Sequence, residues 1–186
     1  FKKSFNSVYS LFAHHFQLGF LKLLRGSALK QKSEQYGYVY RSYPPYEIIG
    51  NSDISANELL KLKDIESCME LFYNSGRFML TMKIIYNSLG DPFEFYENLS
   101  LYMRQEGYLD RPLKPSALYQ ILYNYIGQNF PFITHDIAES LRFDYLSSMK
   151  NSSLPGFLQK QADSSRKERQ KLIKQYEEKL NDILPR

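Results

Sequence analysis

The order of elements in the N-terminal part of the fold is decided by residues 16–40, FQLGFLKLLRGSALKQKSEQYGYVY. An apolar run over residues 16–24 ends abruptly at Arg25-Gly26-Ser27. A polar pattern with helical spacing follows as far as Gly37, and an aromatic and β-branched run begins directly after it. This order predicts a buried strand, a tight glycine turn, a short helix and an extended segment, which is typical of the closing step of an α/β barrel.

The flanking segments complete a small α/β unit over residues 1–50. Residues 4–13 have apolar side chains at helical spacing, with Ser4 in a suitable position for an N-cap. Extended segments are predicted on both sides of Pro44-Pro45. Nothing before residue 16 supplies the other strands that a barrel needs, so we expect the chain to be the C-terminal part of a larger protein.

The pattern changes at Ser55 to that of a helical domain, expected over residues 51–150. Ser55 and Glu58 have the spacing of a capping box, and apolar residues then recur every three or four positions. Glycine and proline residues separate four further helical stretches, and we expect the last of them to be capped by Thr134 or Asp136. Amphipathic helices joined by short turns are typical of a bundle, so the predicted fold class is mainly α.

The last part of the chain is predicted to contain a linker and one more helix. Residues 151–165 are rich in Ser, Asn and Gln and contain Pro155-Gly156, which indicates a linker. Residues 166–186 are charged and amphipathic, with one apolar stripe that consists of Ile173, Tyr176, Leu180 and Ile183. Such a stripe can pack against that of a second copy, which predicts a homodimer through this helix.

Composition excludes several classes of protein. The 24 basic and 20 acidic residues give a net charge of +4, which permits an anionic partner without requiring one. No apolar run reaches the roughly 18 residues that span a bilayer, and no signal peptide is visible, so no membrane partner is expected. The single Cys68 excludes an internal disulfide and a cysteine-rich metal site, and it favours a cytoplasmic location. His14, His15 and His135 lack the spacing of metal ligands, so no metal site is predicted.

Three motifs that occur in a fixed order resemble a known family. They are GFLKLLRGS at residues 19–27, YNSGRF at residues 73–78 and LRFDYL at residues 141–146. Together they are similar to the cobalamin-binding-type radical S-adenosylmethionine (SAM) proteins, in a subgroup described as Fe–S oxidoreductases with an uncharacterised helical domain after the barrel. The resemblance extends to about residue 158, and it implies that residues 1–50 are the end of the radical SAM barrel.

The resemblance implies a parent enzyme that uses a [4Fe-4S] cluster and SAM, while the use of cobalamin is left open. The Cys-x3-Cys-x2-Cys motif of that cluster is absent here, because Cys68 is the single cysteine. We therefore expect the chain to hold no cofactor by itself and not to be catalytic alone. Its implied partners are the upstream barrel domain of the same polypeptide and an unknown substrate. The helical domain would shape the entrance through which the substrate reaches the barrel.

The same resemblance assigns candidate site residues around the glycine turn. In the family this turn lies beside the SAM adenosine, so the wall beside the cofactor is expected to consist of Leu23, Leu24, Gly26 and Ser27. The residues expected near the substrate are Gln17, Lys22, Arg25 and Arg77. A glycine after a strand permits close approach of a ligand to the backbone, and the N-terminus of the following helix offers free N–H groups.

Each of these assignments has a purely structural alternative. Gly26 can be an ordinary turn glycine, and Arg77 part of a helix–helix junction. Cys68 is interpreted as a core residue, and Arg142 with Asp144 as a local ion pair. For the whole chain, the alternative function is a non-catalytic helical module that binds a protein or RNA. Its mixed charges make nucleic acid the weaker interpretation.

Overall fold

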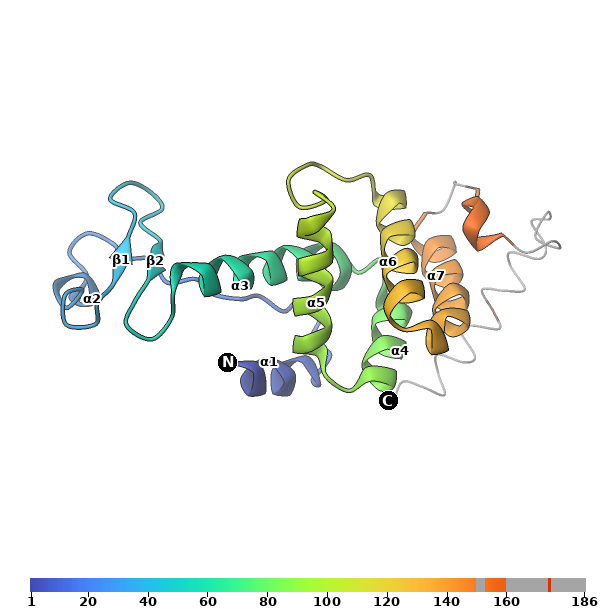
Figure 1. Cartoon of the computed structure of the whole chain (residues 1–186), viewed down its shortest axis with the longest axis horizontal. Coiled ribbons are helices and arrows are strands. Elements are labelled where there is room, and N and C mark those ends of the chain that lie inside the picture. The colour runs from blue at the N-terminus through green and yellow to red at the C-terminus, as the bar shows by residue number, and fades with distance from the viewer. Residues whose placement is uncertain (150–152, 160–173, 175–186) are drawn as a thin grey trace.

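Helices make up most of the structure, a computed structural model that describes residues 1–149, 153–159 and 174 (Figure 1). The mainly α fold class that the sequence predicts is confirmed. The α-helices of the described residues are α1 (Lys2–Tyr9), α2 (Ala28–Gln31), α3 (Ala56–Met69), α4 (Met79–Leu89), α5 (Pro92–Gln105), α6 (Pro115–Asn129) and α7 (Thr134–Ser148). The other elements are strands β1 (Val39–Tyr40) and β2 (Ile48–Gly50), a π-helical turn η1 (Glu70–Asn74), and 3-10 turns η2 (Pro131–Ile133) and η3 (Gly156–Leu158).

Helix α3 connects two regions of different size (Figure 1). At one end lie α2 and the two short strands, which pair antiparallel with Val39 opposite Gly50 and Tyr40 opposite Ile48. At the other end α3 packs across α5, and α7 packs against both α4 and α6. Helix α1 lies against α5. As a result, α2 and the strands lie far from α4, α6 and α7.

Local sequence signals set several of the helix boundaries, among them the predicted capping box of α3. The Oγ of Ser55 accepts a hydrogen bond from the Glu58 amide, and the Glu58 carboxylate accepts one from the Ser55 amide at 2.8 Å, which completes the capping box of α3. Asp91 caps α5 through the Glu94 amide at 3.1 Å. Helix α4 ends where Gly90 takes a left-handed φ of 73°, which glycine adopts without steric cost.

Other predicted caps are wrong. Helix α1 begins at Lys2, so Ser4 lies inside the helix instead of capping it. Helix α7 begins at Thr134 with no side-chain cap, so neither Thr134 nor Asp136 has that role. In both places the sequence offers a residue type that suits a cap, but the helix begins at that residue or before it.

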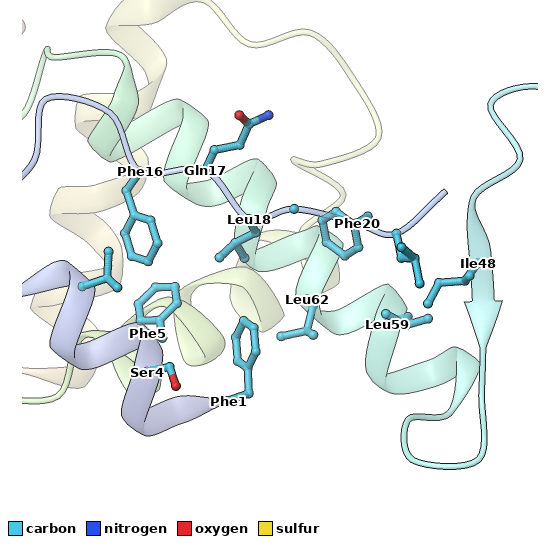
Figure 2. Close-up of a pocket in the computed structure, with 13 residues that line it drawn as sticks. Phe1, Ser4, Phe5, Phe16, Gln17, Leu18, Phe20, Ile48, Leu59 and Leu62 are labelled. Atoms are coloured by element: carbon cyan, nitrogen blue, oxygen red, sulfur yellow. The ribbon is translucent and has the colours of Figure 1, made fainter. Parts of the chain in front are cut away.

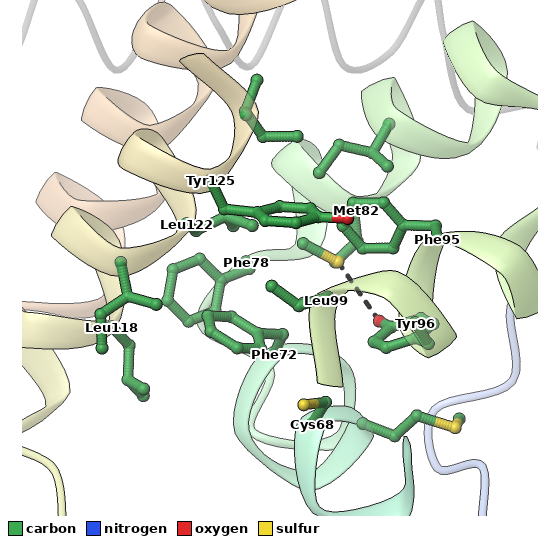
Figure 3. Close-up of a cluster of buried hydrophobic side chains, with 14 of the residues drawn as sticks. Cys68, Phe72, Phe78, Met82, Phe95, Tyr96, Leu99, Leu118, Leu122 and Tyr125 are labelled. Carbon is green, nitrogen blue, oxygen red and sulfur yellow. Dashed lines mark hydrogen bonds between the residues drawn. The ribbon is translucent and has the colours of Figure 1, made fainter. Parts of the chain in front are cut away.

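The core of the helical domain is aromatic and rich in sulfur (Figure 3). Cys68 is fully buried, with its Sγ 3.5 Å from the Sδ of Met103, and burial raises the pKa of its thiol. The interpretation of Cys68 as a core residue is therefore confirmed. Nearby, the Tyr96 hydroxyl donates a hydrogen bond to the Sδ of Met82 at 3.3 Å, so this buried polar atom also has a partner.

Asp144 does not form the predicted ion pair with Arg142. Its carboxylate lies at the N-terminus of α4, where it accepts hydrogen bonds from the Leu80 amide at 3.2 Å and the Thr81 amide at 2.9 Å. The Thr81 hydroxyl donates a third bond at 2.7 Å. Arg142 instead lies 3.8 Å from the carboxylate of Glu139. Asp144 thus supplies from α7 the cap that α4 lacks in its own sequence, since Phe78 offers no side-chain acceptor.

The N-terminal part differs most from its prediction. Residues 16–24 are extended but form no regular strand, and Lys22 makes one isolated antiparallel bridge with Glu47. The predicted helix over residues 27–36 is reduced to the single turn of α2. A parallel strand needs neighbours on both sides, and the described residues supply only the β1–β2 hairpin. The apolar run therefore packs as an extended segment on α3 and the hairpin.

The C-terminal predictions are only partly covered by the structure. Within the predicted linker, residues 156–158 form η3, and Leu158 is buried in contact with the main core. The predicted helix over residues 166–186 lies outside the described residues apart from Lys174, and the apolar stripe proposed for the homodimer lies outside them too.

Candidate functional site

An apolar groove of about 340 Å³ lies between α1, residues 16–21, α3 and β2 (Figure 2). We call it the N-terminal groove, and its walls include Phe1, Phe5, Phe16, Leu18, Leu59 and Leu62. The polar side chains that line it are those of Ser4 and Gln17, and the Gln17 amide points away from the phenylalanines. A cavity of this size and character can accept a row of apolar side chains or a small apolar ligand.

One wall of the groove is an extended segment whose backbone is largely unpaired. Asn74 holds its beginning, because the side-chain amide bonds both the N–H and the C=O of Phe16 at 2.9 Å. Its end is held by the hairpin, where the Leu23 amide donates to the Tyr46 carbonyl at 2.8 Å. Between these anchors, the backbone N–H and C=O groups of residues 17–20 have no hydrogen-bond partner in the described part of the chain. Open backbone groups of this kind accept an added β-strand.

The surface around the groove is unusually apolar. Of the thirteen large apolar side chains that are exposed in the described residues, ten belong to residues 1–60, so the exposure is concentrated in one region. Phe1, Val8 and Leu21 are exposed at the groove itself, and Leu24 lies just beyond it at the glycine turn. A concentration of exposed apolar side chains is typical of a surface that another protein surface covers.

The four candidate cofactor-wall residues lie together at the turn but differ in exposure and in hydrogen bonding. Leu23 is fully buried against Ile48 and Leu59, so it supports the turn from below and faces no ligand. Leu24 is exposed, and Gly26 has a φ of 79° with open space around the position of a β-carbon. The Ser27 hydroxyl is already engaged, because it caps the single turn of α2 through the Lys30 amide and donates to the Leu24 carbonyl.

The candidate substrate-proximal residues are not brought together. Lys22 and Arg25 are exposed near the turn, and the Arg25 guanidinium lies 5.7 Å from the ring centre of Tyr46. Gln17 lies at the other end of the extended segment. Arg77 lies at the junction of η1 and α4, beyond α3 from the turn, where its carbonyl accepts a hydrogen bond from Tyr119 at 3.1 Å. The structural alternative for Arg77, a helix-junction residue, matches this position.

Sequence reasoning missed the residues that form the groove. Asn74 anchors Phe16 from 58 positions away, and its place in the YNSGRF motif gives no sign of that role. Phe1 precedes the helical pattern of residues 4–13, and Leu62 falls within the helical pattern that begins after Ser55. No local signal distinguishes an apolar side chain that faces a groove from one that faces the core, so only the tertiary structure reveals the site.

The chemistry available in the described residues is limited. No group of three or more His, Cys, Asp and Glu side chains is placed to hold a metal ion. No described helix combines the length and the apolarity needed to cross a membrane.

Comparison with known proteins gives one match. The model of a family described as a protein of unknown function, DUF4080, matches residues 34–186. No curated protein and no solved structure matches the chain.

Proposed function

We propose that this chain, which belongs to the DUF4080 family of unknown function, is the C-terminal portion of a radical SAM Fe–S oxidoreductase. The proposal rests on the three motifs that resemble the radical SAM family and on the N-terminal groove. In this proposal the extended segment of residues 16–24 completes the barrel of the parent enzyme. The helical domain covers the barrel opening and shapes the entrance for the substrate. The chain contributes structure and specificity, and it is not catalytic alone.

The observation that carries the proposal is the unpaired backbone of residues 17–20 beside the N-terminal groove. Exposed N–H and C=O groups on an extended segment are a strand edge, and proteins normally cover such edges. A neighbouring barrel strand would pair with these groups, and its inward side chains would enter the groove. Both the hydrogen bonds and the apolar contacts that this region lacks would then come from one partner.

The apolar surface supports the same arrangement. Phe1, Val8 and Leu21 border the groove with exposed side chains, and burial of such a side chain is worth about 1.5–3 kcal/mol when complete. Contiguous exposed apolar side chains of this kind mark a surface that another protein surface covers. The upstream barrel domain is therefore the partner that we propose for the groove.

The described residues do not fit a [4Fe-4S] cluster. Such a cluster is held by several cysteine thiolates, whereas the single Cys68 is fully buried and its thiol pKa is raised. The cluster of the proposed enzyme therefore belongs to the upstream domain. Near the proposed SAM site this chain offers the exposed Leu24 and the open backbone at Gly26, which can lie against an adenosine without steric conflict.

The coding sequence upstream of Phe1 provides the first test. A barrel takes about 200–250 residues, so a Cys-x3-Cys-x2-Cys motif should lie roughly 150 residues or more before Phe1. An upstream sequence that contains no such motif overturns the radical SAM assignment. It leaves the groove as a docking site for a different domain.

A second test uses the full-length protein, purified without oxygen and assayed for cleavage of SAM to 5′-deoxyadenosine. Leu21→Asp places a charge at the proposed strand–barrel contact, where its desolvation is costly, and should lower the rate at least tenfold. The matched control is Leu101→Asp, on the exposed side of α5 and outside the groove, which should keep nearly the full rate. Equal rates for the two variants would contradict the role given to the groove.

A further inference from the structure

Residues 22–46 carry a net positive charge, as do residues 166–174, which lie outside the described residues apart from Lys174. The first range contains five basic residues and one acidic residue, a net charge of +4, which equals the net charge of the whole chain. The remaining residues are therefore neutral overall. The basic residues are Lys22, Arg25, Lys30, Lys32 and Arg41, and the same range contains five of the sixteen tyrosines, Tyr36, Tyr38, Tyr40, Tyr43 and Tyr46. We call these ten residues the basic–tyrosine surface.

Two cation–π contacts connect four residues of this surface. The Lys30 ammonium lies 5.5 Å from the ring centre of Tyr40, which connects α2 to β1. The Arg25 guanidinium lies 5.7 Å from the ring centre of Tyr46, which connects the glycine turn to the approach to β2. These cation–π contacts place positive charge and aromatic rings side by side at the end of the molecule that carries α2 and the hairpin (Figure 1).

The charges of this surface are not neutralised within the structure. The ion pairs found in the described residues involve none of its five cations. Glu47, the nearest acidic residue in sequence after Arg41, pairs with Lys63 of α3 instead. Two of the rings are also available to solvent, since Tyr43 is 61% exposed and Tyr36 is 40% exposed. Uncompensated cations and exposed aromatic rings thus occur together.

We propose that the basic–tyrosine surface binds single-stranded nucleic acid. Its cations would contact backbone phosphates, and Tyr43 and Tyr36 would provide rings on which bases stack. A phosphorylated peptide would use the cations but not the rings, and a membrane, whose interface also accepts tyrosine rings, is distinguished by vesicles in the test below. A duplex keeps its bases stacked inside the helix, so it would also leave the rings unused. The combination therefore favours unpaired bases.

Fluorescence anisotropy of the full chain with a labelled twelve-nucleotide oligouridine tests the proposal. The oligonucleotide should bind at 50 mM KCl, and its affinity should fall steeply as KCl is raised to 300 mM. Three or four phosphate contacts give a slope of about −2 to −3 in a plot of log affinity against log salt concentration. The matching oligothymidine should also bind, whereas a duplex of the same length should bind at least tenfold more weakly.

Variants separate this surface from general charge effects. Tyr43→Ala should weaken binding about 5- to 50-fold through lost stacking, and Phe132→Ala, which removes an exposed ring of α6–α7 instead, should change it less than twofold. Lys32→Gln should reduce the salt slope by about 0.7, whereas Lys114→Gln should leave it unchanged. Tyr43 and Lys32 are both exposed, so circular dichroism of the two variants should show an unaltered helix content.

Three results would overturn the proposal. One is no salt-dependent anisotropy change at 50 mM KCl with the chain at 50 µM. Another is equal loss of affinity in Tyr43→Ala and Phe132→Ala. The third is binding of the duplex, or of vesicles containing an anionic phospholipid, as tightly as the single strand with the same dependence on Tyr43.

Discussion

Phe72 and Leu23 are both fully buried, but they belong to cores of very different size. Phe72 lies in the large aromatic core, to which α1, α3 and the helices from α4 to α7 all contribute. Leu23 shares a cluster with only Ile48 and Leu59 as its other buried members. The helical domain buries its own apolar side chains, whereas the N-terminal part leaves many of its apolar side chains exposed. The comparison predicts that the large core, with α1 included, is stable by itself and that the small cluster around Leu23 needs a partner surface.

The largest expected effect tests this difference directly. Phe72→Ala should lower the free energy of unfolding by about 3–5 kcal/mol, because it opens a cavity in a well-packed core. Leu23→Ala should cost less, roughly 2–3 kcal/mol, at the lower end for this substitution, because few packed neighbours surround the cavity. Urea unfolding followed by circular dichroism measures both. Equal costs would show that the small cluster and the large core unfold as one cooperative unit.

Removal of the cap on α4 should have the next largest effect. Asp144→Ala leaves the buried amides of Leu80 and Thr81 without an acceptor, which should cost about 2–4 kcal/mol in the same unfolding assay. Ser140→Ala is the control, because it alters the hydroxyl beside Thr81 but leaves the carboxylate in place. A similar loss in both variants would mean that the carboxylate has no special role.

The same carboxyl should make stability depend on pH. Burial raises the pKa of Asp144 to about 7, above its value in the unfolded chain. Between about pH 4 and pH 7 the folded state therefore holds a proton that the unfolded state has lost, so the contribution of this group to stability falls as the pH rises. The difference in unfolding free energy between the wild type and Asp144→Asn should be larger at pH 5 than at pH 8. A difference that grows with pH would contradict the raised pKa.

The smallest expected effect concerns the boundary between the two regions. Ser55→Ala removes the acceptor of the capping box at the start of α3 and should cost about 1 kcal/mol. Hydrogen exchange should show whether the loss is local. Faster exchange limited to the first turn of α3 and the hairpin would support two regions of separate stability. Faster exchange throughout α4–α7 would argue for one.

The helical domain could be predicted well because its signals are local. The Ser55–Glu58 capping box, the Asp91 cap and Gly90 each act on neighbouring residues, so their spacing is sufficient to place α3, α4 and α5. The N-terminal part could not be predicted in the same way. A strand is completed by its neighbours, and residues 16–24 lack the parallel partners that their composition anticipates.

The roles of residues that depend on distant partners could not be predicted from the sequence either. The role of Asp144 as the cap of α4 joins residues more than 60 positions apart, and the Asn74 anchor of Phe16 joins residues 58 apart. The sequence showed suitable side chains at these positions without indicating their partners. For Arg142 and Asp144 the nearest oppositely charged residue in the sequence was the wrong choice.

The sequence by itself determined the mainly α class, the helix limits set by caps and glycines, the burial of Cys68 and the presence of a basic, tyrosine-rich segment. These features follow from periodicity, residue type and local hydrogen bonding, which act over a few positions. The tertiary structure alone decided where the N-terminal groove lies, which backbone groups stay unpaired and which charges lack partners. Those properties depend on which distant segments pack together, and packing is a property of the whole fold.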